Sequence, residues 1–187
     1  LVKRIAANIN IPFTVGGGIG SVADVALLLQ NGADKISVNT AAYNNPKLIS
    51  ELSSAFGSQC IVLAIDTKKE TNGGWYVYLN GGRTKTQTKT IDWAKQAVDN
   101  GAGEILLTSM NNDGTKNGFA LDITAALSNS LPVPVIASGG AGKIEHFKDV
   151  FEIANADAAL AASIFHYNEI QIPALKKYLQ PFVNIRI

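Results

Sequence analysis

The sequence predicts an α/β fold built on a parallel sheet. Short apolar runs rich in β-branched residues alternate with longer stretches of helical periodicity, and this pair occurs six times along the 187 residues. Each pair takes about 31 residues, which is the usual length of a strand with its crossover helix. The run Ile61–Ile65 is apolar throughout, which is typical of a parallel strand buried on both faces.

The elements follow one another in a regular order. Six strands are expected, over residues 13–15, 35–38, 61–65, 104–107, 133–137 and 158–161. The helices that follow them are expected over residues 22–31, 46–56, 90–100, 120–129, 144–154 and 171–180. Ser21, Asn45 and Thr90 precede three of the helical patterns, and each has a side-chain oxygen that can cap a helix N-terminus.

One segment, at about 67–90, interrupts this order after the third strand. Gly-Gly pairs at 73–74 and 81–82 flank an alternating apolar pattern formed by Trp75, Val77 and Leu79. Alternation between glycine-rich turns predicts a β-hairpin inserted into the α/β order. Since no low-complexity segment or linker is found, residues 1–187 are expected to form a single domain.

The chain also contains an internal repeat. The segment Gly17–Gly20 with the later pair Ala33-Asp34 is echoed by Gly139–Gly142 with the later pair Ala156-Asp157. The two glycine runs are 122 positions apart and the two Ala-Asp pairs 123 positions apart. The first two units therefore match the last two at a four-unit spacing, which predicts eight units in all and a (β/α)8 barrel.

Six of those eight units are found here, and we expect them to be units three to eight. A complete barrel of this kind has about 250 residues. Residues 1–6 have the spacing of the last turns of a helix, and the only methionine is Met110, so we expect the front of a longer protein to be absent. Six strands leave two apolar edges open, and such a chain must pair with another chain, rearrange or aggregate.

Composition excludes several classes of function. The formal net charge is +1, from 16 basic and 15 acidic residues that form no block, so no nucleic acid or membrane partner is expected. No apolar run approaches the roughly 18 residues that span a bilayer. The single Cys60 and the lack of a secretory signal favour a cytoplasmic protein.

Glycines after two strands predict sites for anions. Backbone amides in such turns can surround a phosphate, and Gly16–Gly18 and Gly139–Gly140 both stand where such turns form. One unit later, each turn is followed by small or polar residues, Asn39-Thr40 and Ala162-Ser163, that can complete the site. Two such sites related by a repeat indicate a bisphosphate ligand. The alternative is that the glycines only permit tight turns.

Two acids lie at the C-terminal ends of predicted strands, where barrel enzymes place their catalytic groups. Asp66 follows five apolar residues, and desolvation there would suit it to general acid or base catalysis. Asp113 lies in an Asp-Gly-Thr segment, and either acid could instead organise its own loop. Lys35 and Glu104 are the first residues of their strands, so both would lie at the opposite, N-terminal face of the barrel. Charged side chains there are usually solvated or in ion pairs.

No cofactor or metal is expected. His146 and His166 lack the spacing of metal ligands and are assigned structural roles. The sequence lacks the Ser-His-Asp order that is typical of hydrolases. The glycine run Gly16–Gly20 lacks the spacing of a dinucleotide-binding motif.

The chain closely resembles the cyclase subunit of imidazole glycerol phosphate synthase, from histidine biosynthesis. The resemblance extends from Leu1 to Ile187 and is most specific in six blocks, 11–19, 33–42, 101–109, 113–116, 137–143 and 156–166. A related barrel isomerase of the same pathway shares the glycine-rich turns and the Asp-Gly-Thr block. The hairpin and the Lys35/Glu104 pair fit the cyclase better.

The resemblance implies a reaction and a set of site residues. The family adds ammonia to a bisphosphorylated aminoimidazole carboxamide ribulosyl nucleotide, giving imidazole glycerol phosphate and aminoimidazole carboxamide ribonucleotide. Asp66 matches one of two catalytic aspartates. The residues that match one phosphate site are Gly18, Asn39 and Thr40. Those that match the neighbourhood of the other are Gly114, Ser138, Gly140, Ala162 and Ser163. Thr108 and Asp113 match positions that line the substrate cleft.

The resemblance also implies a partner. In the family, a glutaminase subunit supplies the ammonia and docks on the N-terminal face of the barrel to form a heterodimer. Lys35 and Glu104 match half of a charged ring that gates the barrel core, and Asp34 matches a position near the docking surface.

The departures from the family lie at the front of the chain. The first two family units have no counterpart here, and they contain the second catalytic aspartate, so we expect low activity from these 187 residues. Two alternatives stay open. The chain could be a non-catalytic phosphate-binding or self-associating scaffold, or it could be the related isomerase.

Overall fold

The computed structural model describes residues 1–185, which form one sheet with six parallel strands and an attached hairpin. The parallel strands, in spatial order, are β1 (Thr14–Gly16), β2 (Lys35–Val38), β3 (Ile61–Lys69), β6 (Glu104–Ser109), β7 (Val135–Ser138) and β8 (Ala158–Leu160). Every neighbouring pair among the six is parallel. Spatial order follows chain order, so each crossover leads to the adjacent strand, as the six predicted units require.

Helices cover the outer side of the sheet. The main helices are α2 (Val22–Gln30), α4 (Lys47–Phe56), α5 (Thr90–Asp99), α6 (Leu121–Ser128), α7 (Ile144–Glu152) and α9 (Ile172–Leu179). Shorter ones are α1 (Val2–Ala6), α3 (Thr40–Asn44), the 3-10 turn η1 (Ser58–Cys60) and α8 (Ser163–His166). Within residues 1–185, none of these helices is long and apolar enough to cross a membrane.

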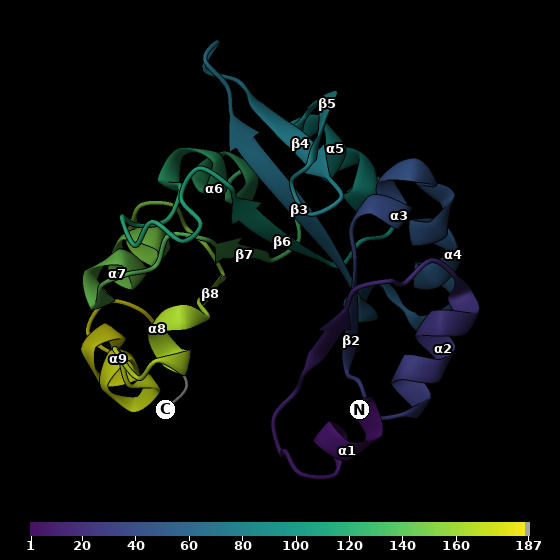
Figure 1. The fold of residues 1–187 in the computed structure, drawn as a ribbon, viewed down its shortest axis with the longest axis horizontal. Coiled ribbons are helices and arrows are strands. Elements are labelled where there is room, and N and C mark those ends of the chain that lie inside the picture. The colour runs from purple at the N-terminus through teal and green to yellow at the C-terminus, as the bar shows by residue number, and fades with distance from the viewer. Residues whose placement is uncertain (186–187) are drawn as a thin grey trace.

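The sheet curls, with helices along its convex side, so that the molecule forms an open arc (Figure 1). The strands β1 and β8 end the path, and in the part of the chain that the structure describes neither pairs with a further strand. A curled parallel sheet with alternating helices is the architecture of a (β/α)8 TIM barrel over six of its units. The predicted fold class is therefore confirmed.

The hairpin extends the sheet beyond the end of the apolar run. β4 (Trp75–Leu79) pairs antiparallel with the second half of β3, and β5 (Thr84–Lys89) pairs antiparallel with β4. The strand β3 reaches Lys69, four residues past the predicted end at Ile65, because β4 on one side and β6 on the other supply partners for its polar half. Asp66 therefore lies within a paired strand, opposite Thr108 of β6 and Tyr78 of β4.

The two faces of the sheet differ in burial. Side chains that point toward the helices are fully or almost fully buried, namely Ile36, Val38, Leu63, Ile65, Ile105, Leu107, Val135 and Ala137. Alternate residues on the concave face are mostly half-buried, among them Ser37, Ala64, Leu106 and Ile136. Burial on both faces, expected from the apolar run in β3, is confirmed at Val62, which is 1% exposed on the concave face, and is wrong at Ala64, which is only half-buried.

Of the three predicted helix caps, one is confirmed. The hydroxyl Oγ of Ser21 accepts a hydrogen bond from the amide of Asp24 at the start of α2 (3.2 Å). The cap predicted at Asn45 is wrong, because Pro46 occupies the cap position of α4. The cap predicted at Thr90 is wrong as well, because Thr90 is the first residue of α5. Its buried hydroxyl is hydrogen-bonded to the hydroxyl of Thr67 instead.

The internal repeat reappears as matched hydrogen bonds. The Asp34 carboxylate accepts from the amide of Phe13 (2.8 Å), and the Asp157 carboxylate accepts from the amide of Val135 (2.9 Å). In each half, an aspartate before one strand thus fixes the start of the preceding strand in the sheet.

A second match lies at the two helix starts. The amide of Gly20 donates to Oδ2 of Asp24, and the amide of Gly142 donates to Nδ1 of His146, both at 3.1 Å. His146 occupies the position in the second half that Asp24 occupies in the first. The hydrogen bonds give it the structural role expected from the sequence.

Candidate active site

The C-terminal ends of three strands place polar side chains in one row. In the strand register, Asp66 of β3 is paired with Thr108 of β6, which is paired with Ser138 of β7. Residues paired in this way point to the same face of a sheet, here the concave one. The C-terminal ends of parallel strands are where α/β barrels bind and transform substrates.

Asp66 is the half-buried acid of this row. Nδ2 of Asn39, from the end of β2, donates a hydrogen bond to its Oδ2 at 3.0 Å. Burial raises the pKa of Asp66, the Asn39 hydrogen bond partly offsets this by stabilising the carboxylate, and the charge of Asp113 raises the pKa further. A carboxyl with a raised pKa exchanges protons closer to neutral pH, as a general acid or base requires.

A cavity of about 690 Å³ lies beside Asp66, between the first glycine-rich turn and the end of β2. Its lining includes residues 16–20, residues 37–41, Asn44, Ala64, Asp66 and Gly81. Gly17 and Gly18 have φ of 98° and 70°, and a Cβ on either would meet no atom within 4 Å. The backbone of this turn is thus exposed to the cavity, as a phosphate site requires.

A second cavity, of about 240 Å³, lies against the other half of the repeat. Its lining consists of Asp113, Gly114, Lys116, residues 138–141 and residues 160–163. Gly140 has φ of 103°, and a Cβ there would lie 2.0 Å from the carbonyl oxygen of Gly118. This glycine is therefore also required for close packing, which is the alternative considered for the glycine turns.

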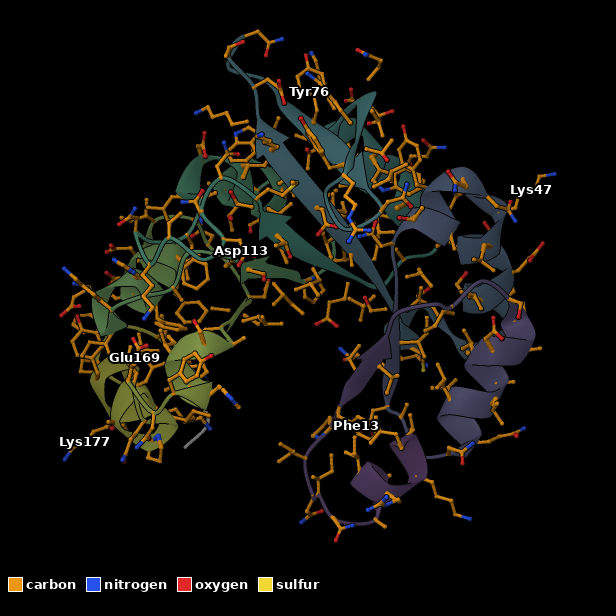
Figure 2. All side chains as sticks on the ribbon, viewed as in Figure 1. Phe13, Lys47, Tyr76, Asp113, Glu169 and Lys177 are labelled. Atoms are coloured by element: carbon orange, nitrogen blue, oxygen red, sulfur yellow. The ribbon has the colours of Figure 1, made fainter. Side chains whose placement is uncertain are left out.

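The structure thus brings the predicted residues together in two groups. The first cavity is lined by Gly18, Asn39, Thr40 and Asp66. The second cavity is lined by Asp113, Gly114, Ser138, Gly140, Ala162 and Ser163. Thr108 lines neither cavity and lies between Asp66 and Ser138 in the row. Figure 2 shows Asp113 on the half of the molecule that contains α7, α8 and α9, and Lys47 on the other half.

Some residues at these cavities were not predicted. Gly81 lines the first cavity, and the amide of Asn80 beside it donates to the hydroxyl of Thr40 at 3.0 Å, so the hairpin turn belongs to this site. The Gly-Gly pair at 81–82 signals a turn but gives no sign of where that turn packs. Lys116 lines the second cavity and pairs with Glu169 (2.6 Å), a residue 53 positions away.

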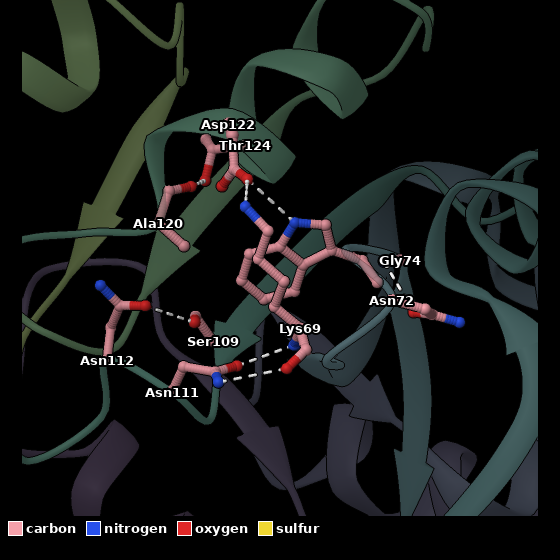
Figure 3. A network of polar contacts seen from close by, with 10 residues as sticks. Lys69, Asn72, Gly74, Ser109, Asn111, Asn112, Ala120, Asp122 and Thr124 are labelled. Carbon is pink, nitrogen blue, oxygen red and sulfur yellow. Dashed lines mark hydrogen bonds and ion pairs between the residues drawn. The ribbon is translucent and has the colours of Figure 1, made fainter.

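A network of polar contacts supports the loop after β6 (Figure 3). Lys69 and the indole of Trp75 both bond to the carboxylate of Asp122, at 2.7 and 3.1 Å. The amide of Lys69 donates to Oδ1 of Asn111 (2.8 Å), which ties the end of β3 to this loop. The hydroxyl of Ser109 donates to a further residue of the loop, Asn112, at 2.7 Å.

At the opposite end of the strands, Lys35 and Glu104 form an ion pair. Nζ of Lys35 on β2 lies 2.6 Å from Oε2 of Glu104 on β6, across the intervening strand β3. The Glu104 side chain is 15% exposed and that of Lys35 is 37% exposed. Asp34, next to Lys35, uses its carboxylate on the backbone of Phe13. These residues lie at the N-terminal face, away from Asp66.

In residues 1–185, no group of three or more His, Cys, Asp or Glu side chains is placed to hold a metal ion. The chemistry available at the row is proton transfer by Asp66 and the binding of anions by backbone amides, hydroxyls and the Asn39 amide.

Comparisons with known proteins show which proteins the chain resembles. Residues 1–171 match the family described as "Histidine biosynthesis protein". The chain is 60% identical over 176 residues to the imidazole glycerol phosphate synthase subunit HisF of Flavobacterium psychrophilum, covering 94% of this chain and 70% of the relative. The subunit of the same name from Bacteroides thetaiotaomicron is 60% identical over 179 residues, covering 96% of this chain and 71% of the relative. That from Phocaeicola vulgatus is 57% identical over 188 residues, covering 100% and 74%.

Proposed function

This chain belongs to the histidine biosynthesis protein family and, within it, to the HisF subunits of imidazole glycerol phosphate synthase, and we propose that its two cavities hold the two phosphates of one substrate. The chain is thus an enzyme subunit of histidine biosynthesis. The substrate we propose is the bisphosphorylated aminoimidazole carboxamide ribulosyl nucleotide. The observation that carries the proposal is the position of Asp66, in a row whose two ends adjoin glycine-lined cavities.

Each end of the substrate meets a different set of donors. At the first cavity, the exposed turn at Gly17–Gly18 offers backbone amides, and Asn39 and Thr40 add side-chain groups. At the second cavity, the turn at Gly139–Gly140 is joined by the hydroxyls of Ser138 and Ser163. Since the two turns are related by the repeat, they suit two like charged groups on one extended molecule.

Asp66 serves as the proton-transfer group between the two phosphates. Ammonia addition, ring closure and cleavage into imidazole glycerol phosphate and aminoimidazole carboxamide ribonucleotide each move protons. Burial keeps the pKa of Asp66 raised, so the protonated form persists to higher pH than in an ordinary aspartate. The Asn39 amide holds Oδ2 of Asp66 and leaves Oδ1 for the substrate.

Ammonia enters from the N-terminal face, where a glutaminase subunit docks. The Lys35–Glu104 ion pair lies at that end of the strands and forms part of the gate. Its two side chains come from strands on either side of β3, so the pair closes over the N-terminal end of the concave face.

Self-association is a second candidate property. Within residues 1–185, the outer edges of β1 and β8 have no partner strand, so their backbone donors and acceptors are open to pairing with another copy. The molecular mass in solution decides this point, because pairing at those edges gives a dimer or larger species and unpaired edges give a monomer.

The experiment for catalysis supplies the substrate with ammonium ion and measures imidazole glycerol phosphate. We expect slow product formation from the wild-type chain, because the second catalytic aspartate of the family has no counterpart in it, and a further fall in kcat of about 10²–10⁴-fold in D66N. D99N is the matched control, because Asp99 is an exposed aspartate at the C-terminal end of α5 and lines neither cavity. Equal rates in wild type, D66N and D99N would refute the role of Asp66.

A further inference from the structure

The loop between β6 and α6 carries Asp113 and forms one wall of the second cavity. Its first residues are fixed by the backbone, because the amide of Met110 donates to the carbonyl of Thr67 and the amide of Asp113 donates to that of Ser109, both at 2.9 Å. The end of the loop, at Gly118, lies against the glycine turn of β7. The amide of Gly118 donates to the carbonyl oxygen of Gly140 at 2.8 Å.

Asn112 joins the two ends of this loop. Its Oδ1 accepts from the hydroxyl of Ser109 at 2.7 Å, and its Nδ2 donates to the carbonyl oxygen of Gly118 at 2.8 Å. Only this orientation of the amide satisfies the carbonyl of Gly118, which needs a donor. Ser109 is 2% exposed, so its hydroxyl depends on this partner rather than on water.

The contact with Gly118 brings Asn112 within reach of the second glycine turn. A Cβ added to Gly140 would lie 2.0 Å from the oxygen of Gly118 and 2.9 Å from Cβ of Asn112. A Cβ on Gly139 would lie 3.3 Å from Cβ of Asp113. The Asp113 loop and the turn are thus packed without a gap, and movement of one displaces the other.

We propose that Asn112 is a positioning residue, whose side-chain amide holds the Asp113 loop against the Gly139–Gly140 turn and so fixes the geometry of the second cavity. It acts through Asp113 and the turn rather than on the substrate. The consequence for turnover rests on the proposed function, whereas the consequence for the geometry of Asp113 does not.

The neighbouring amide, Asn111, supplies a matched control. It too makes two hydrogen bonds, but both go to the backbone of Lys69, at 2.8 and 3.4 Å, so they tie β3 to the loop and do not involve Gly118. Variant N111A therefore removes an equal side chain from the adjacent position. Variant N112D keeps the shape and the acceptor of Asn112 but cannot donate to Gly118.

The kinetic test compares KM and kcat for the bisphosphate substrate with ammonium ion. We expect N112A and N112D to raise KM about tenfold, because the cavity wall loosens, with a smaller change in kcat. S109A removes the other contact of the same amide, so the effects of S109A and N112A should be less than additive. N111A should leave KM within about twofold of the wild type.

The second readout is the pKa of the Asp66 carboxyl, measured by NMR titration without substrate. The groups that face Asp66 are Asn39 from β2, Thr108 and Tyr78 from the paired strands, and the charge of Asp113. The hydroxyl of Tyr78 is bonded to Glu70, so Asp113 is the charge that the loop can move. We expect N112A to lower the pKa of Asp66 in the direction of D113N, and N111A to leave it unchanged.

Each outcome decides the proposal. Thermal melting shows which variants fold. If N112A does not, S109A provides the same pKa comparison and N112D the same KM comparison, because the carboxylate added in N112D would itself raise the pKa of Asp66. A shifted Asp66 pKa without turnover in any variant would support the positioning role and sink the proposed function. If N112A matched N111A in both KM and Asp66 pKa, and N112D matched it in KM, with differences only in melting temperature, Asn112 would be a stabilising residue alone and the proposal would fail.

Discussion

Nδ2 of Asn39 lies 3.0 Å from Oδ2 of Asp66, and this hydrogen bond links the ends of two neighbouring strands inside the first cavity. Asn39 is a predicted phosphate ligand and Asp66 a predicted proton-transfer group. Under the proposed function, one amide connects the binding of the anion to the ionisation of the acid. The bond also partly offsets the rise in the pKa of Asp66 that burial causes.

Replacing Asn39 tests this connection. In N39A the carboxylate of Asp66 loses its donor while its burial persists, so we expect the pKa of Asp66 to rise above that of the wild type. NMR titration of the side-chain carboxyl measures this directly. T40V serves as the comparison, since Thr40 lines the same cavity and its hydroxyl bonds to Asn80 rather than to Asp66. A lower pKa in N39A would contradict the account.

The raised pKa of Asp66 also predicts how stability depends on pH. An acid whose pKa is higher in the folded state favours folding below its unfolded pKa, and this contribution is lost as pH rises through the folded pKa. D66N cannot ionise, so we expect it to melt at a higher temperature than the wild type at pH 7. The difference should shrink as pH falls through the raised pKa of folded Asp66 and level off below the unfolded pKa of about 4. Thermal melts across this range, with D99N as control, test the sign.

Equivalent glycines of the repeat should respond differently to alanine. Gly18 has φ of 70° and open space where a Cβ would lie, so G18A costs only backbone strain, roughly 1–2 kcal/mol. Gly140 adds a collision with the backbone of Gly118, so we expect G140A to cost about 3 kcal/mol or more. Urea unfolding of the two variants gives the comparison. Equal costs would show that the second turn is less tightly packed than the structure indicates.

The Lys35–Glu104 ion pair is partly exposed, and its energetic coupling should be small. We expect a double-mutant cycle with K35M and E104Q to give about 0.2–1 kcal/mol, decreasing as salt is added. In the presence of a glutaminase subunit, both single variants should lower the ratio of glutamine-dependent to ammonium-dependent turnover. An unchanged ratio would argue against a gating role for this pair.

The order of elements could be predicted because it depends on periodicity. The strand β2 has the bounds expected from its apolar run, and each main helix lies within one or two residues of its expected range. The strand β3 was predicted too short, because its second half contains Asp66 to Lys69 and is held by partner strands rather than by an apolar pattern. The short helices α3 and α8 were missed, since four or five residues are too few to show a period.

The candidate site was predictable where residue type alone points to chemistry. Glycines in turns with positive φ and an acid after a buried strand both leave such a signal. Contacts between distant side chains leave none, so the Lys116–Glu169 pair and the contact from the Asn80 amide to Thr40 appear only in three dimensions. The same holds for Asn112, whose role depends on the position of Gly118.

The central claim is that one bisphosphate substrate spans both cavities. NMR titration of the backbone amides of Gly18 and Gly140 with the substrate tests it without requiring turnover. The account predicts that both resonances respond with a single Kd and saturate at one equivalent, and that D66N binds in the same way. Separate affinities at the two glycines, or a response at only one of them, would contradict it.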